Sequence, residues 1–338
     1  MKLFSKIVLA AILANLATLV SGDEITLYSH RHYDSDRDLY AAFTKKSGIK
    51  VNVVKASADE LIERLKAEGE NSKADILMTV DAGRLQRAKA AGLLQSIESK
   101  VLKDRIPASY RDPENQWFGL SVRARVIVYA ADRVKPSELS TYENLASPSW
   151  RGRLLARSSS NIYNQSIMAS IIAQHGVNDA RDWAAAVRGN MARPPQGNDR
   201  DQIRAVAAGL GDAALVNTYY VGLLINSSNA KDREIGNSVS LFFPNQKDRG
   251  TPVNVSGAGI AKASKNPEGA IKFLEFLASK EAQSTFPQAT YEYPVSTDVP
   301  WSNLQKTWGE FKPDTLNLGM LGELNEAAAT VFNESGWE

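Results

Sequence analysis

Four tyrosines stand where a predicted strand or loop passes into a predicted helix, and they offer the clearest chemistry in the chain. They are four of eleven tyrosines: Tyr33, Tyr163, Tyr219 and Tyr220. Ser160 or Asn161 precedes one of them, and Asn217 precedes the adjacent pair. These residue types cap helix N-termini. A phenol at such a terminus faces the positive end of the helix dipole, which favours its ionised form.

The energy needed to ionise a phenol decides what such a site would bind. Lowering the pKa of a tyrosine from ~10 to below 7 costs about 4 kcal/mol, whereas a helix dipole supplies ~1 kcal/mol in ordinary settings. A bound trivalent cation supplies the rest, because the charge of a metal dominates ionisation around it. Phenolate is a hard anionic oxygen ligand, which suits ferric iron better than zinc or copper. Taken alone, Tyr219-Tyr220 also fits a core residue beside a surface residue.

The first of these tyrosines lies in a polar segment that follows the predicted strand Ile25–Tyr28. The segment reads Ser29-His30-Arg31-His32-Tyr33-Asp34 and holds two of the three histidines of the chain. The carboxyl ends of strands are where open α/β sheets bind their ligands. An imidazole could therefore lie beside the phenol, although a polar surface loop explains the segment equally well.

The motifs of common catalytic sites are absent from the sequence. There are no cysteines, which excludes disulfides, thiolate metal sites and cysteine nucleophiles. There is no G-x-S-x-G elbow, Walker-A loop or H-E-x-x-H pair. We expect the glycines of Ser256–Gly259 to reflect close backbone packing, and His175, beside Gly176, to cap the end of a helix. An exported hydrolase is therefore not favoured, and we expect no enzyme.

Composition indicates a folded, exported protein of about two domains. The chain has 338 residues, 43% of them hydrophobic and 23% charged, and ~150 residues make a typical domain. Lysine and arginine number 40 against 38 acidic residues. Two of the lysines lie in a leader without acidic residues, so the rest of the chain is near neutral. The charge gives no argument for a nucleic-acid partner.

Residues 1–22 are predicted to be a signal peptide. Lys2 and Lys6 precede an apolar run from Ile7 to Val20, and Val20 and Gly22 occupy the −3 and −1 places of a cleavage site. The alternative is an uncleaved membrane anchor, but the run is short of the ~20 residues that a span needs. We therefore expect cleavage, export and a location in the periplasm.

Strand and helix patterns alternate through the rest of the chain, which predicts α/β lobes with parallel strands and covering helices. A long alternating run at Trp117–Ala130 is predicted to cross from one lobe to the other, and Val253–Ala261 is a second extended run. Pro267–Thr285 is predicted as one helix, and residues 304–338 as a helical tail. Two lobes joined by crossing strands place a ligand cleft between them.

Several segments together resemble the periplasmic iron-binding proteins of ABC importers, specifically the cyanobacterial FutA type. The resemblance covers essentially the whole chain after the leader. The segments that carry it are HRHY at His30–Tyr33, SVRARVIVY at Ser121–Tyr129, RSSSNIYNQS at Arg157–Ser166, PQGNDRDQI at Pro195–Ile203, NTYYVG at Asn217–Gly222, FFPNQ at Phe242–Gln246 and NVSGAGIAK at Asn254–Lys262.

The resemblance implies a type II periplasmic-binding-protein fold whose two lobes close over one iron ion. An N-lobe would comprise residues 23–120 and about 248–300, and a C-lobe residues 121–247 and about 301–338. Tyr33 from the N-lobe and the other three tyrosines from the C-lobe would be the metal ligands. His32 is a ligand in some relatives and a neighbour in others. The implied partners are an ABC permease and its ATPase, served by a monomer.

Arg123 matches an arginine of the crossing strand that lies beside the site in FutA-type relatives. Ferric iron with four tyrosinates carries a formal charge of −1, and one guanidinium would bring the cluster to zero. Ferrous iron would leave the same shell at −2 and is expected to bind more weakly. The alternative for Arg123 is a surface ion pair without a part in binding.

Two features depart from other ferric-binding proteins. Some branches use a histidine, a glutamate, two tyrosines and a synergistic anion, but the third strand here ends Thr79-Val80-Asp81-Ala82, without a glutamate. This argues against an anion-dependent site. His30 replaces a residue that is usually small, which adds an imidazole near the site. The sequence leaves open whether ferric or ferrous iron is the working ion, and whether His30 or His32 ligates it.

A solute-binding protein for a small organic ligand is the alternative function. A binder of polyamines, sugars or carboxylates would present aromatic sandwiches and Asp or Glu pairs in its cleft. Four phenols at strand-to-helix junctions do not match that pattern, so iron is favoured.

Overall fold

The computed structural model describes residues 23–31 and 33–337. The predicted signal peptide at 1–22 and the candidate residue His32 lie outside these described residues, so both stay predictions. Within the described part of the chain, no helix has the length and apolar character needed to cross a membrane.

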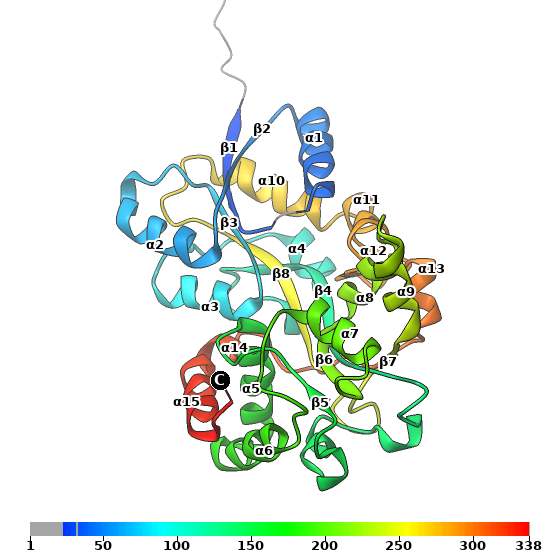
Figure 1. Cartoon of the computed structure of the whole chain (residues 1–338). Helices are drawn as coiled ribbons and strands as arrows, with labels where there is room; N and C mark the ends of the chain where they lie inside the picture. The colour runs from blue at the N-terminus through cyan, green and yellow to red at the C-terminus, as the bar shows by residue number, and fades with distance from the viewer. Residues whose placement is uncertain (1–22, 32, 338) are drawn as a thin grey trace, which may run out of the picture.

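The strands form a continuous series of paired neighbours in the order β2-β1-β3-β8-β4-β6-β5, with β7 and β9 added to β4 (Figure 1). Their bounds are β1 Glu24–Ser29, β2 Lys50–Lys55, β3 Ile76–Val80, β4 Phe118–Tyr129, β5 Leu154–Leu155, β6 Ala213–Asn217, β7 Ser240–Phe242, β8 Val253–Ile260 and β9 Tyr293–Pro294. β1 pairs in parallel with β2 and β3, and β5 in parallel with β6. The predicted parallel arrangement is thereby confirmed.

Helices cover the sheet around β1, β2 and β3. They are α1 Ser35–Ser47, α2 Ala58–Glu68, α3 Ala82–Ala90, α4 Lys100–Arg105 and α10 Pro267–Leu277. α1 buries Leu39 and Phe43 and ends at Gly48, whose φ of 77° favours glycine. Ser57 and Glu60 form a capping box at the start of α2. Local sequence signals therefore set these helices, as predicted.

The long strand β4 joins the two halves of the molecule, as the alternating run predicted. Its first part pairs antiparallel with β8, from Phe118 to Ala124. Its second part pairs with β6, from Arg125 to Tyr129. All of β4 is buried, because each of its faces is covered. The change of partner falls after Ala124, slightly beyond the predicted boundary at residue 120; the division into an N-lobe and a C-lobe stays a prediction.

The second half of the molecule surrounds β5 and β6. Its helices are α5 Ile162–His175, α6 Val177–Gly189, α7 Asp199–Ala207, α8 Thr218–Ile225 and α9 Ala230–Ser238. Asn161 caps α5 by accepting a hydrogen bond of 3.0 Å from the backbone N–H of Tyr163, as one of the two predicted caps. His175 ends α5 as expected, and its ring nitrogen Nε2 lies 3.0 Å from a carboxylate oxygen of Glu143.

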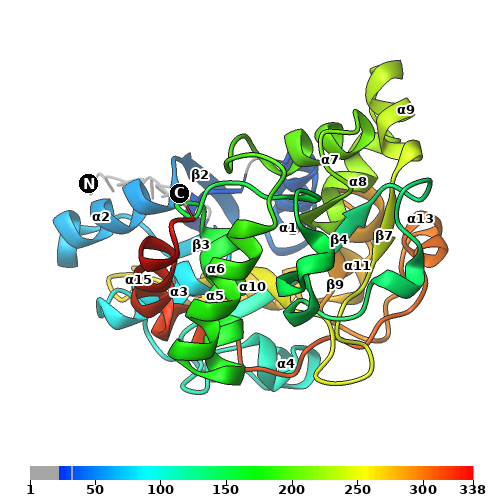
Figure 2. The ribbon, with the colours of Figure 1, turned by 60° about the horizontal axis from the view of Figure 1, so that its bottom comes forward.

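The predicted helix Pro267–Thr285 is divided into α10, α11 Lys280–Gln283 and α12 Thr285–Ala289. The break is at Ser279, whose hydroxyl accepts from the backbone of Ala282 and starts a new helix. The predicted C-terminal helical tail is also divided, into α13 Asn303–Thr307, α14 Met320–Glu323 and α15 Asn325–Ser335. α14 packs against both α3 and α5, and Figure 2 shows α15 beside α5 and α6.

The glycines of β8 lie where the backbones of two strands approach closely. A Cβ atom at Gly257 would lie 2.4 Å from the carbonyl oxygen of Phe118, and one at Gly259 would lie 2.4 Å from that of Gln116. Both separations are too short for any side chain. The expected packing role of this motif is therefore confirmed.

Candidate metal centre

The fold brings the predicted tyrosines into one cluster. The hydroxyl oxygens of Tyr163 and Tyr219 lie 3.4 Å apart, and the rings of Tyr219 and Tyr220 lie against each other with centroids 4.2 Å apart. Tyr33 lies within electrostatic range of both Tyr163 and Tyr219. Four phenols from three segments that are distant in sequence therefore share one site.

Three of these phenols come from the first turns of helices. Tyr163 is the second residue of α5, and Tyr219 and Tyr220 are the second and third of α8. Tyr33 comes from the loop between β1 and α1. The helix dipoles of α5 and α8 thus point their positive ends toward the cluster, in the arrangement that the sequence predicts.

The close approach of α8 to the segment before β9 requires a glycine. A Cβ atom at Gly222 would lie 2.6 Å from the ring of Tyr291. Tyr291 itself has a φ of 58°, a left-handed conformation that few bulky residues adopt. This contact holds the segment that carries Glu292, the residue after Tyr291, against α8.

The pKa values of Tyr33, Tyr219 and Tyr220 lie above the usual value of a tyrosine, which favours their protonated forms when no cation is bound. Burial, followed by the neighbouring phenols, raises the pKa of Tyr219 well above its usual value. Burial and the phenol of Tyr163 likewise raise that of Tyr220. For Tyr33, burial and the carboxylate of Glu292 raise the pKa, and two nearby arginines lower it in part. The helix dipoles alone are therefore insufficient to ionise the site, as the sequence argument predicts.

Arg123 lies beneath the cluster, buried in β4 with 1% of its surface exposed. It donates to the carbonyl of Val255 at 3.2 Å and to the hydroxyl of Ser256, and forms an ion pair of 2.9 Å with Glu292. Its guanidinium carbon lies 5.9 Å from the ring centroid of Tyr219. The ion pair of Arg123 is therefore buried and not at the surface, while its part in iron binding stays a prediction.

Sequence reasoning missed two charged residues of this site. Arg31 forms an ion pair of 3.0 Å with Glu292 and contacts both carboxylate oxygens of Asp36 at 3.1 and 3.2 Å. Its guanidinium carbon lies 4.9 Å from the ring centroid of Tyr33. A cation two residues from a predicted ligand was a usable signal for Arg31. Glu292, in the segment Thr290–Pro294, had no such signal.

Glu292 is fully buried and remains charged. Burial by itself raises the pKa of this carboxyl, but the guanidinium groups of Arg31 and Arg123 outweigh it and bring the pKa to about 2. The hydroxyl of Ser121 also donates to it at 2.9 Å. A buried carboxylate is stable only with such partners.

A second charged group lies behind the tyrosines of α5 and α8. Asp199 accepts from Arg125 at 2.6 Å and from Arg157 at 3.1 Å, and from the backbone N–H of Asn217 at 2.8 Å. The guanidinium carbon of Arg157 lies 5.6 Å from the ring centroid of Tyr163. This group holds the start of α7 against the end of β6.

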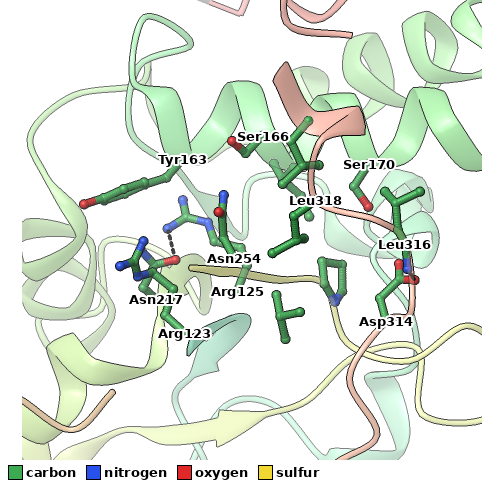
Figure 3. A pocket seen from close by; sticks show the side chains of 14 residues that line it. Arg123, Arg125, Tyr163, Ser166, Ser170, Asn217, Asn254, Asp314, Leu316 and Leu318 are labelled. Carbon is green, nitrogen blue, oxygen red and sulfur yellow. Dashed lines mark hydrogen bonds between the residues drawn. The ribbon is translucent and has the colours of Figure 1, made fainter. Parts of the chain in front are cut away.

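A small cavity lies between β4, β8 and α5, next to these groups. Figure 3 shows Ser166 and Asn254 near each other at one side of it, and the hydrogen bond between Arg125 and Asn217 at its edge. The side chain of Tyr163 extends away from the apolar end of the cavity, which Leu316 and Leu318 line. The cavity therefore adjoins the phenol cluster without containing its oxygen atoms.

Asp81 directly follows β3 and caps the start of α3. It is fully buried, and its carboxylate accepts hydrogen bonds of 2.8 Å each from Gly83, Ser166 and Asn254. Burial raises the pKa of Asp81. Because three donors already bind this carboxylate, it holds parts of the fold together and is not exposed as a metal ligand would be.

Of the two histidines in the segment before Tyr33, His30 lies within the described residues, next to β3. The backbone N–H of His30 donates to the carbonyl of Met78 at 3.0 Å, and His30 lies within electrostatic range of Asp59 on α2. Across residues 23–31 and 33–337, no three His, Cys, Asp or Glu side chains are grouped so that they could hold a metal ion. The phenols remain the donor set that the sequence singled out.

Comparison with known proteins places the chain among solute-binding proteins. The family described as bacterial extracellular solute-binding protein matches residues 71–312. The chain belongs to this family. The family binds solutes and is not defined by a catalytic activity, in agreement with the expectation that the chain is no enzyme.

Several relatives of the chain are named for iron uptake or iron binding. Iron uptake protein A1 of Synechocystis sp. is 50% identical over 315 residues, covering 93% of this chain and 88% of that protein. A Trichodesmium FutA in complex with iron and citrate ligands is 54% identical with a TM-score of 0.91, covering 93% and 100%. A ferric binding protein from Campylobacter jejuni is 43% identical with a TM-score of 0.88, again covering 93% and 100%. The FutA-type resemblance and the type II periplasmic-binding-protein fold are confirmed.

Proposed function

We propose that this protein is the extracytoplasmic iron-binding component of an ABC importer. It captures iron, foremost as Fe3+, between its two lobes through the phenolate oxygens of four tyrosines: Tyr33, Tyr163, Tyr219 and Tyr220. The observation that carries the proposal is the convergence of these phenols at the N-termini of α5 and α8, with Tyr33 opposite. The iron-binding relatives support it.

Protonated phenols suit a protein that must both hold and release iron. Because burial raises the pKa of Tyr219 and Tyr220, each phenol must lose a proton to the solvent when it binds iron. The ion supplies the charge that makes this loss favourable. Acidification reverses the exchange, so affinity depends steeply on pH. His32, beside Tyr33, is proposed as a further ligand or a close neighbour.

The setting follows from the family and the leader. The signal peptide at residues 1–22 would be removed on export, and the mature protein would act in the periplasm as a monomer. It would deliver its ion to an ABC permease powered by an ATPase. Iron-binding relatives do not favour the alternative of a small organic ligand.

The test is spectroscopic. Adding ferric iron, supplied as its nitrilotriacetate complex, to the mature protein should produce a tyrosinate-to-iron charge-transfer band. Tyr219→Phe with Tyr220→Phe removes two phenolates and should abolish the band and tight binding. Tyr293→Phe is the matched control, because its buried hydroxyl makes no hydrogen bond within the described structure. Unchanged ferric binding in the double variant would refute the ligand assignment, and binding of an organic solute without iron would favour the alternative.

A further inference from the structure

A single buried carboxylate joins the two arginines beneath the phenols. The oxygens of Glu292 accept from Arg31 at 3.0 Å and from Arg123 at 2.9 Å. Hydroxyl groups of Ser121, Ser256 and Thr290 surround the same carboxylate at 2.9 to 3.4 Å. Every direction around Glu292 is therefore occupied by a donor, and its position is tightly defined.

Each arginine faces a different part of the phenol cluster. Arg31 lies under the ring of Tyr33 at 4.9 Å, and Arg123 faces the ring of Tyr219 at 5.9 Å. Glu292 pairs with both of these guanidinium groups. Its negative charge is therefore separated from the rings of Tyr33 and Tyr219 by one guanidinium group in each case.

The charges of this cluster cancel. Arg31 and Arg123 contribute two positive charges, and Asp36 and Glu292 two negative charges. The charge of Arg123 is therefore already neutralised by Glu292. The sequence predicts that this guanidinium balances the −1 charge of the ferric complex by itself, and the ion pair with Glu292 argues against that. Behind the tyrosines of α5 and α8, Asp199 pairs with Arg125 and Arg157, so this second charged group has a net charge of +1. Asp81 is a further buried acidic residue, outside both of these charged groups.

The two oxidation states of iron respond differently to such a charge. When four phenols lose their protons to the solvent and bind, the complex is formally −1 with Fe3+ and −2 with Fe2+. A negative charge nearby raises the free energy of the ferrous complex more, since that complex is more negative. The low dielectric of a buried site enlarges this difference.

We propose that Glu292 determines the preference of this site for ferric over ferrous iron. The inference rests on the proposed iron-binding function and adds a specificity-determining residue to it. By cancelling one of the two guanidinium charges, Glu292 withholds from the ferrous complex the compensation that it needs. By holding both guanidinium groups in place, it keeps their positive charges close to the rings of Tyr33 and Tyr219 in a cluster that is neutral as a whole.

The experiment separates the effect of the charge of residue 292 from the effect of its size. Glu292→Gln keeps the size of the side chain and removes its charge, whereas Glu292→Asp keeps the charge. Glu68→Gln is the control, since Glu68 pairs with Arg64 on α2 and accepts from the hydroxyl of Tyr28 on β1, outside the phenol cluster. Affinities for Fe3+ and Fe2+ are measured by competition with a ferric chelator in air and a ferrous chelator under argon. The midpoint potential of the bound iron is a second readout.

Glu292→Gln should raise the ferrous affinity relative to the ferric affinity by about tenfold and raise the midpoint potential. Glu292→Asp and Glu68→Gln should keep the ratio of the parent. An unchanged ratio in a folded Glu292→Gln variant overturns the proposal, as does an equal loss of both ions in the Gln and Asp variants, which would indicate a purely structural role. If Glu292→Gln does not fold, Asp36→Asn takes its place in the test. This variant also removes one negative charge that pairs with Arg31, so it must shift the ratio in the same direction.

Failure of the proposed function would look different. In that case the parent protein itself would show neither a charge-transfer band nor ferric affinity, and the ratio could not be defined for any variant. A parent that binds ferric iron, with variants that do not change the ratio, refutes only the role of Glu292.

Discussion

The hydroxyl of Ser166 donates a hydrogen bond of 2.8 Å to the buried carboxylate of Asp81. Asp81 follows β3 and caps α3, in the half of the molecule that carries Tyr33, whereas Ser166 lies one helical turn after Tyr163 on α5. Residues three apart on a helix share a face. The bond therefore links the two sides of the cleft next to a predicted iron ligand.

This link should hold the lobes closed over iron. Ser166→Ala removes the donor and leaves a buried carboxylate with one partner fewer, and a hydrogen bond to a charged group is worth about 1.5–3 kcal/mol. We expect iron to be lost to a chelator about tenfold faster, with the charge-transfer band unchanged. Stopped-flow chelator competition measures the rate.

Ser170→Ala is the matched control for this prediction. Ser170 lies on the same helix, also buried, and its hydroxyl bonds Arg249 instead of Asp81. Equal rates of iron loss in the two variants would mean that the bond to Asp81 does not stabilise the closed form. Small-angle scattering of the iron-loaded proteins should show a larger radius for Ser166→Ala alone.

Iron binding should release protons from the phenols. The pKa values of Tyr33, Tyr219 and Tyr220 are raised above the usual value of a tyrosine, so these groups are protonated at pH 7 and must ionise to bind. Ferric affinity should therefore fall as the pH is lowered. Calorimetry in buffers of different ionisation enthalpy counts the protons, and Tyr219→Phe should release about one fewer than the parent. The same count in both proteins would exclude Tyr219 as an anionic ligand.

Arg123 should matter both for folding and for iron. Arg123→Ala leaves Glu292 buried with Arg31 as its remaining cation, and breaking a buried ion pair costs about 3–5 kcal/mol. We expect lower stability and weaker ferric retention, with partial recovery in Arg123→Lys, which keeps the charge. Chelator titration and denaturant unfolding measure the two effects.

A double variant separates these effects. Arg123→Ala with Glu292→Gln removes both charges, so the free energy of unfolding should recover more than the ferric affinity does. Equal ferric affinity in the parent and all Arg123 variants would remove this residue from the binding mechanism.

Glu292 should also contribute to stability in acid. Its pKa is about 2 in the folded protein, against about 4.3 in an unfolded chain. A carboxyl with a lowered pKa stabilises the fold above its unfolded pKa, and this contribution is lost as the pH falls through the folded value. The loss between pH 5 and pH 2 is roughly 3 kcal/mol. Unfolding by urea across this range should show a steeper decline for the parent than for Glu292→Gln, and parallel curves would contradict the assignment.

The amino-acid sequence by itself determined the elements and the donor chemistry. Strand and helix periods, and caps such as Asn161 and the capping box at Ser57, act within a few residues of one another. Local signals of this kind survive without knowledge of the fold. The positions of the four tyrosines at strand-to-helix junctions were visible for the same reason, and the resemblance to FutA-type proteins depended on those segments.

Only the tertiary structure decided which charges surround the phenols. Glu292 is distant in sequence from both Arg31 and Arg123, and no spacing or period connects them; they meet because β9 pairs with β4. The bond between Asp81 and Ser166 likewise depends on α5 packing beside the end of β3. Burial then sets the energetics, since a carboxylate removed from water must be paired, and a pairing between distant segments is a property of the packed chain and not of any local pattern.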